Sequence, residues 1–398
     1  MDGMKKKKYY FFLPEEIIID ILSRLPVKSV LQCRLVCKAW RSLVCDPSFA
    51  HMHLLRRRRH DDDHGKVNIA VMTLFENNSS ERFHYTLDNE NCEKSYEIRS
   101  FDFSSDDDLI LCDIVGSCNG LICIADYKDD GSLYIFNPIT RECLNLPNLI
   151  NQSSCLRIED MVYGFGYLPS TNEYKVVRIC YYEHFAGRVQ VYTLGAGSGW
   201  RDKGEITYSL IFYPPEPTIL ANGALHWRDG GEIVAFDLAD EEFLLLPTPP
   251  CSLLDSENDQ YPFQLQVLGG RLCVVHCKNE VSVEVWSLKK NEKNGNYGDI
   301  KGQKDYQFWS WIKEFDVDSD LEARDPTPLA LTMRGEVLLY NRGTLFRYDL
   351  KTATSEKLVD IGKYLSACRI FEAVPHWNSF VSLKALGEED TKIIESAS

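Results

Sequence analysis

The residues best able to do chemistry in this chain of 398 residues are its 14 cysteines. Three groups stand out, and none contains a CxxC pair. A zinc site needs a second ligand pair at a suitable distance, and the CxxxC and CxxxxC spacings found here lack one. We therefore expect buried structural thiols, with no metal site and no cofactor. The groups are Cys33, Cys37 and Cys45; Cys112, Cys118 and Cys123; and Cys273, His276 and Cys277.

The sequence lacks the patterns of common catalytic sites, namely a nucleophile elbow, a phosphate loop, an HExxH helix and a dinucleotide fingerprint. The glycine-rich stretch GAGSG at 195–199 is followed by Trp200 and not by a helix, which favours a turn. Large aromatic residues in β repeats belong mostly to the core. We apply that interpretation to His226 and to Trp200, Trp227, Trp286, Trp309 and Trp311. We expect no catalytic residue and a protein that is not an enzyme.

The formal charge of −15 hides a difference between the two parts of the chain. Residues 1–60 carry 13 Lys and Arg against 5 Asp and Glu, whereas the rest carries 31 against 54. An acidic body is a poor candidate for wrapping a nucleic acid. The split indicates that the N-terminal part and the body have different partners, neither of them a nucleic acid.

The first residues look briefly like a secretory signal, because a basic patch precedes the apolar run 9–13. That run has five residues, whereas a signal core needs about 7–15. No later stretch approaches the roughly 18 apolar residues that span a bilayer. We expect a protein of the cytoplasm, the nucleus or both, with reduced cysteines and no membrane partner.

Residues 13–53 have the periodicity of short amphipathic helices. Pro14 suits a helix start, and Glu15 and Glu16 favour the positive end of the helix dipole. Apolar residues then recur on one helix face up to Leu25, and Pro26 ends that helix. Two more short helices are expected over 27–35 and 36–44.

About 40 residues rarely form a self-sufficient core, and this segment is more apolar than three short helices can hide. An apolar face should therefore stay exposed, and such a face usually marks an interface. The alternative is that this face docks on the protein's own β body. Both interpretations remain open from the residues alone.

Charged or weakly patterned segments flank these helices. Residues 1–12 are expected to be an N-terminal tail, 54–66 a charged linker and solvated helix end, and 386–398 a C-terminal tail. The run Arg56–Arg59 could contact an acidic partner or direct nuclear import, but a solvated segment is the favoured interpretation. His60 and His64 flank three aspartates, and a metal site there is disfavoured because adjacent loop residues rarely preorganise one.

The body, residues 67–385, consists of short runs rich in β-branched and aromatic residues, separated by Gly, Asn, Asp and Pro. One unit occurs three times, opening at 119–121, 222–225 and 334–337. A Leu-Pro pair closes the first two copies, and the third copy lacks the proline. A second type of unit, ending in tryptophan, alternates with the first. Alternating hairpin units that cannot bury a face alone predict a closed β-propeller of about six to eight blades.

The N-terminal run resembles the F-box in its plant-type form, through its two Leu-Pro pairs and its Val-Cys-Lys-x-Trp segment. This resemblance implies docking onto the Skp-type adaptor of a cullin-containing SCF ubiquitin ligase. In the family, the residues matching this pattern form either the adaptor interface or the small core behind it. The matching residues are Leu13, Pro14, Ile17, Ile21, Leu22, Leu25, Pro26, Val30, Val36, Cys37 and Trp40.

The body resembles the F-box-associated, kelch-like region of plant F-box proteins, through NGLI, LYIFNPITREC, FGYLPSTNEYKVV and NGALHW. Residues 67–110 match poorly and include the acidic loop Ser104–Asp108. The fold expected is therefore mainly β, with a three-helix F-box before a kelch-like propeller.

Together the two resemblances imply a non-catalytic substrate receptor whose propeller binds an unidentified protein target for ubiquitination. Two alternatives stay open. One is a propeller enzyme or small-molecule binder with a structural helical cap, and the other is an F-box scaffold acting outside the ligase.

Overall fold

Four helices begin the chain in the computed structural model. They are α1 (Glu15–Leu22), α2 (Val27–Cys33), α3 (Lys38–Val44) and α4 (Pro47–His64). We call residues 13–64 the helical head. The structure describes residues 13–64, 68–75, 81–88, 96–101, 112–126, 132–147, 161–182, 186–210, 217–253, 263–278, 282–290, 309–318, 326–332, 334–341, 343–360 and 368–394.

Within these residues the body forms six antiparallel sheets, here called blades 1 to 6. Blade 1 has the order β24 (Cys368–His376), β1 (Asn68–Phe75), β2 (Glu81–Asp88), β3 (Tyr96–Phe101). Blade 2 has the order β4 (Cys112–Cys118), β5 (Leu121–Asp126), β6 (Ser132–Asn137), β7 (Glu142–Asn145), β25 (Lys392–Ile393). Blade 3 has the order β8 (Met161–Leu168), β9 (Glu173–Tyr182), β10 (Ala186–Thr193), β11 (Arg201–Ile206).

The remaining blades repeat the four-stranded meander. Blade 4 has the order β12 (Ile219–Ala221), β13 (Ala224–Asp229), β14 (Glu232–Asp237), β15 (Phe243–Leu245). Blade 5 has the order β16 (Gln264–Leu268), β17 (Arg271–Lys278), β18 (Ser282–Lys290), β19 (Trp309–Asp318). Blade 6 has the order β20 (Thr327–Leu331), β21 (Glu336–Asn341), β22 (Thr344–Asp349), β23 (Thr354–Asp360). A short 3-10 helix, η2 (Pro250–Leu253), follows blade 4.

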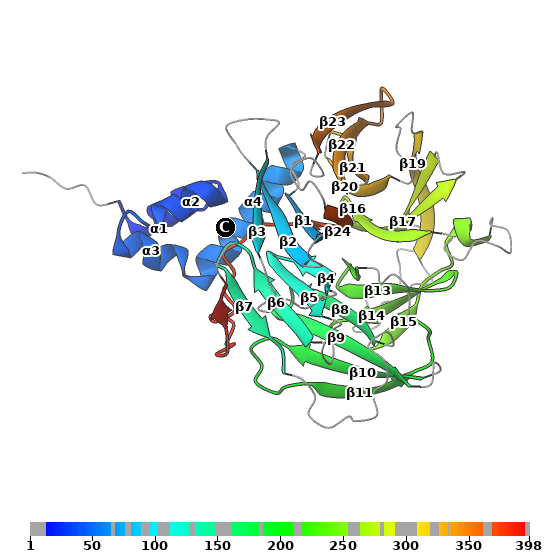
Figure 1. Cartoon of the computed structure of the whole chain (residues 1–398), viewed down its shortest axis with the longest axis horizontal. Helices are drawn as coiled ribbons and strands as arrows, with labels where there is room; N and C mark the ends of the chain where they lie inside the picture. The colour runs from blue at the N-terminus through cyan, green and yellow to red at the C-terminus, as the bar shows by residue number, and fades with distance from the viewer. Residues whose placement is uncertain are drawn as a thin grey trace, which may run out of the picture.

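The blades close into a ring. The first strand of each sheet contacts the first strand of the next, in the order β4, β8, β12, β16, β20, β24 and back to β4. Blade 1 makes this closure, because β24 comes from the end of the body and pairs with β1 from its beginning. The chain is therefore a β-propeller whose six sheets match the lower end of the expected range (Figure 1).

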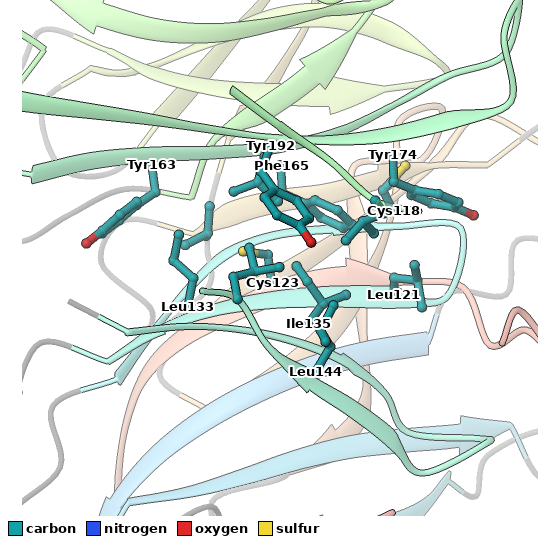
Figure 2. Close-up of a cluster of buried hydrophobic side chains, with 14 of the residues drawn as sticks. Cys118, Leu121, Cys123, Leu133, Ile135, Leu144, Tyr163, Phe165, Tyr174 and Tyr192 are labelled. Atoms are coloured by element: carbon teal, nitrogen blue, oxygen red, sulfur yellow. The ribbon is translucent and has the colours of Figure 1, made fainter. Parts of the chain in front are cut away.

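Alternate residues of one strand face two different blade interfaces. On β5, Ile122 and Ile124 pack toward blade 1, whereas Leu121 and Cys123 pack toward blade 3. Figure 2 shows the second interface, where residues of blade 2 meet Tyr163, Phe165, Tyr174 and Tyr192 of blade 3. Because both faces of the inner strands are covered, strands such as β5 and β13 are buried along nearly their whole length, with little polar alternation.

The repeated sequence unit corresponds to blades 2, 4 and 6. In blades 2 and 4, Asn119-Gly120 and Asn222-Gly223 make the first hairpin, and all four residues have positive φ. A second turn follows the third strand, where a side-chain carboxylate or amide oxygen accepts from the backbone N–H two residues on, at 2.7–2.9 Å. The residue four places on has a positive φ. The turns begin at Asn137, Asp237 and Asp349 and reach Arg141, Glu241 and Ala353.

Both flanking boundaries differ from the expected ones. Helix α4 continues to His64, so the segment 54–66 is mostly helix and not linker. Residues 386–394, which we expected to belong to a tail, include β25, which pairs with β7. The C-terminal strand could not be predicted from its own composition, because its partner β7 lies about 250 residues away in sequence. The acidic loop Ser104–Asp108 lies outside the described residues.

Candidate functional site

The helical head starts each of its first three helices with a residue that the sequence pattern singled out. Pro14 precedes α1, and its carbonyl accepts from Ile17 N and Ile18 N at 3.1 and 3.2 Å. Pro26 precedes α2 in the same way. The Cys37 thiol at the start of α3 accepts from the backbone N–H of Trp40 at 3.5 Å. Prolines fit here because a helix start leaves backbone N–H groups without intrahelical partners.

Burial separates the predicted adaptor residues into two sets, which the sequence alone did not. Ile17 and Ile21 lie at i, i+4 spacing on α1, each 46% exposed, and Leu13, just before the helix, is 55% exposed. We call these three the α1 stripe. Pro14, Val36 and Cys37 are exposed too. The core set comprises the buried Leu22 and Val30 and the half-buried Leu25, Pro26 and Trp40.

Leu35 is the most exposed large apolar residue that the structure describes in the head, at 87%. The apolar pattern of Val27, Val30, Leu31 and Leu35 predicted that Leu35 belongs to the second helix. That prediction is wrong because α2 ends at Cys33, which leaves Leu35 and Val36 in the turn before α3. Val36 is 66% exposed. The exposed apolar surface from residue 13 to the start of α3 therefore comprises the α1 stripe and this α2–α3 turn, and Leu55 on α4 is 44% exposed.

An ionic brace ties α1 to α4. Arg56 contacts the Asp20 carboxylate at 2.8 Å and donates to the Asp20 carbonyl at 3.0 Å and to the hydroxyl of buried Ser23. Arg24 also contacts Asp20, at 3.0 Å. Hydrogen bonds from Arg24 and then Arg56 hold the pKa of Asp20 below its ordinary value. Arg56 thus has a structural partner inside the head, whereas the side chains of residues 58–64, including His60 and His64, lie outside the described ones.

A second apolar face of the head is covered by the propeller. Phe49 and Ala50 of α4 belong to one continuous buried cluster with Ile122, Phe136 and other residues of blade 2. Both interpretations of the apolar surface of the head therefore apply. One face packs on the propeller, and the α1 stripe and α2–α3 turn remain exposed. Figure 1 shows α1 to α3 standing to one side of the blades, with α4 leading back to them.

The cysteines behave largely as packing residues. Cys118, Cys123, Cys143, Cys180, Cys251 and Cys273 are buried. The expectation of burial is wrong for Cys37, Cys45 and Cys277, which are exposed. Among the residues with described placement, no three His, Cys, Asp or Glu side chains are grouped so as to hold a metal ion. Across the same residues, no helix combines the length and apolar character needed to cross a membrane.

The propeller residues that were interpreted as structural are packed. Trp227 and Trp311 are buried, and Trp200, Trp286 and Trp309 pack against buried clusters. His226 is buried, with Nδ1 3.1 Å from the Ile219 carbonyl. The stretch 195–199 forms a turn, as predicted, and Gly195 within it has φ +75°.

Two carboxylates of the propeller have altered acidity. Burial raises the pKa of Asp113 on β4 to about 6. Burial would also raise the pKa of Glu241, but hydrogen bonds from Arg201, Lys175 and Lys203 hold it well below its ordinary value. These cations belong to blade 3 and Glu241 to a turn of blade 4. This cluster of ion pairs connects two adjacent blades.

Comparison with known proteins agrees with this architecture. The family model of the F-box associated beta propeller domain matches residues 70–300, and an F-box-like model matches residues 11–56. An F-box protein of Arabidopsis thaliana is 29% identical, over 92% of this chain and 89% of its own length. An F-box/kelch-repeat protein of the same plant is 27% identical, over 86% of this chain and 92% of its own length. The Arabidopsis F-box protein CPR1 is 28% identical over 70% of both chains.

The fold and the helical head define a propeller protein with an N-terminal F-box-like segment. The chain belongs to the family of plant-type F-box proteins with an F-box-associated propeller domain. Residues 67–110, whose resemblance to the family had looked poor, fall almost entirely within the family match and contribute β1 to β3 of blade 1, so they belong to the same domain.

Proposed function

We propose that this protein is a substrate receptor of an SCF-type ubiquitin ligase. The helical head binds a Skp-type adaptor and through it a cullin, and the propeller binds a protein target. The observation that carries this proposal is the exposed apolar surface of the α1 stripe and α2–α3 turn, within the segment that matches the F-box-like model.

The exposed residues suit docking to a protein surface. Ile17 and Ile21 offer aliphatic side chains on one face of α1, with Leu13 exposed just before the helix, and an amphipathic helix enters an apolar groove through such a face. Burying apolar surface stabilises a complex by roughly 25 cal/mol per Å² before the costs of association. Lys28 on α2 and Lys38 and Arg41 on α3 are exposed and favour an acidic partner, chiefly by raising the association rate.

The role of this chain in ubiquitin transfer is proximity. A receptor accelerates transfer by holding a target lysine near the activated ubiquitin, which replaces an encounter between separate molecules. No group of this chain has to bond to the reacting atoms. The proposed partners are therefore two proteins, the adaptor and the target.

Co-purification with a Skp-type adaptor and its cullin tests the ligase role. The wild-type chain should recover both, and the double variant Ile17→Asp with Leu35→Asp should recover neither. Recovery of the adaptor without the cullin would favour a scaffold outside the ligase. Equal recovery by both chains would contradict docking through the head.

Proximity labelling with the same double variant addresses the target. A receptor that cannot reach the ligase should keep its targets undegraded, so they should be enriched over labelling by the wild-type chain. A control with Ser42→Asp, an exposed polar site on α3, should behave like the wild type.

A further inference from the structure

The C-terminal segment 377–394 touches both the helical head and two blades of the propeller. It leaves β24 at the point where the ring closes, and its last described residues pair with β7 at the outer edge of blade 2. In Figure 1 this red segment lies on the side of the propeller from which the helices project.

Hydrogen bonds from two turns of blade 2 fix the segment to that blade. Asn137 Nδ2 donates to the carbonyls of Ser379 and Val381 at 3.2 and 2.6 Å. The Ser379 hydroxyl donates to the Asn119 carbonyl at 2.7 Å. A Cβ on Gly120 would lie 2.0 Å from that hydroxyl, so the hairpin leaves room for nothing larger than glycine.

A carboxylate on blade 2 holds the next part of the segment. Glu142 accepts from the Ser382 hydroxyl at 2.8 Å and from the Leu383 N–H at 2.6 Å. Farther on, the Ile394 N–H donates to the Arg141 carbonyl at 2.9 Å. The segment therefore follows blade 2 from its first hairpin to its outer edge.

The segment also reaches blade 3. Glu388, only 9% exposed, accepts from Tyr192 Oη at 3.2 Å and from the Gly195 N–H at 2.7 Å. A Cβ on Gly195 would lie 1.8 Å from the Leu386 carbonyl oxygen. Buried charge-assisted hydrogen bonds of this kind are stronger than neutral ones and fix geometry.

One side chain of the segment packs into the head. Phe380 is buried, with its ring 5.1 Å from the His53 ring and 6.2 Å from the Phe49 ring of α4. His53 Nε2 is 2.9 Å from the carbonyl of Leu25, which links this contact to the turn between α1 and α2. Ile394, at the far end of the segment, packs against the buried cluster that contains Phe49 and Phe380.

We infer that the C-terminal segment 377–394 is a positioning element that fixes the angle of the helical head to the propeller, with Phe380 as its contact with the head. Polar contacts fix the segment to blades 2 and 3, and Phe380 packs it against α4. If the proposed function holds, this element also sets where a bound target lies relative to the ligase. Only this second part of the inference rests on the proposed function.

A distance measurement on the full chain tests the first part. Spin labels are introduced as unnatural amino acids at the exposed positions Ser42 on α3 and Ser209 beyond β11, and the distance distribution is recorded. The wild type should give one narrow distribution. Phe380→Ala should broaden it at least twofold, and Phe380→Leu, which keeps an apolar side chain, should broaden it less.

Phe263→Ala is the matched control, because Phe263 is equally buried but packs between blades 4 and 5, away from the head. It should lower the melting temperature comparably and leave the distribution narrow. A broad distribution in the wild type would overturn the inference, and so would narrow distributions in both Phe380 variants.

Self-ubiquitination by a reconstituted Skp-type ligase tests the second part, with the chain's own lysines as the probe. A fixed angle should direct ubiquitin to a reproducible subset of propeller lysines, and Phe380→Ala should spread it over more positions. The same lysine pattern in both chains would overturn this part. No ubiquitin on the wild type would count against the proposed function and leave the distance result standing.

Discussion

The indole N–H of Trp200 in blade 3 donates to the carbonyl of Pro147 in blade 2 over 2.8 Å. The same bond recurs two blades on, where Trp311 of blade 5 donates to the Pro247 carbonyl of blade 4 over 2.7 Å. The tryptophans of one sequence unit thus donate, and the Leu-Pro pairs of the other accept, in one recurring inter-blade hydrogen bond.

The third copy of the repeated unit lacks this proline. Leu358 and Val359 of blade 6 stand where the other copies have Leu-Pro. The blade that follows in the ring is blade 1, and its outer strand β3, YEIRSF, contains no tryptophan. The proline and the tryptophan are therefore both absent where blade 6 meets blade 1.

Replacing these tryptophans should destabilise the propeller. Trp311→Phe keeps the apolar contact but leaves the Pro247 carbonyl without its donor, which should lower the free energy of unfolding by about 1–2 kcal/mol. Trp200→Phe should cost less, because its bond is exposed to solvent. Urea unfolding of the two variants measures this, and a Trp311→Phe protein as stable as the wild type would contradict the role.

Gly195 should tolerate alanine far less well than its neighbour Gly197. Both have positive φ, but a Cβ at 195 would meet the Leu386 carbonyl, whereas a Cβ at 197 meets nothing within 4 Å. Gly197→Ala should cost about 1 kcal/mol of backbone strain, and Gly195→Ala at least twice that. Thermal unfolding compares the two, and equal losses would refute the close approach of the C-terminal segment.

Two buried histidines should make the protein less stable as the pH falls. Burial lowers the pKa of His53 to about 4 and that of His376 to about 3, so both stay neutral in the folded chain. The unfolded chain binds more protons below pH ~6.5, so stability is present above that value and is lost as the pH falls toward 4. Between pH 7 and 5 each histidine should remove about 2 kcal/mol.

Unfolding of His53→Gln at pH 7 and pH 5 measures this effect. The variant is expected to be less stable at pH 7 but to lose less stability on acidification than the wild type does. A pH dependence unchanged by the substitution would show that His53 does not titrate in this window.

Asp113 should have the opposite effect on stability to the two histidines, making the protein more stable as the pH falls. Because burial raises its pKa to about 6, ionisation above that pH opposes folding. Asp113→Asn should therefore raise the free energy of unfolding at pH 7 by about 1–3 kcal/mol, and the gain should vanish near pH 4, where both side chains are neutral. A variant that is destabilised at pH 7 would contradict this assignment.

Local signals in the sequence were sufficient for part of this structure. The Asn-Gly pairs predicted the hairpins at 119–120 and 222–223 because a two-residue turn is set by its own φ angles. Pro14 predicted the start of α1, and Pro26 predicted the end of that helix, because a proline has no backbone N–H to donate within a helix. The alternating units predicted the ring because each must bury both faces on a neighbour.

The features that escaped prediction depend on distant parts of the chain. Blade 1 is completed by β24, about 300 residues from β1, so residues 67–110 read as an incomplete unit. Segment 377–394 is held in its conformation by contacts with blades 2 and 3. Leu35 was misplaced because the end of α2 at Cys33 changes which face it takes, and helix ends are the least predictable feature of a local pattern.

The most direct test of the account is the affinity of the purified full chain for a Skp-type adaptor, measured by titration calorimetry with three proteins. The wild type should bind, and Ile17→Asp with Leu35→Asp should lose binding at least 100-fold with an unchanged melting temperature, because both side chains lie at the surface. Leu22→Ala should lose about 2–5 kcal/mol of stability yet bind while folded, because Leu22 is buried. Undiminished binding by the double variant would contradict docking through the exposed residues of the head.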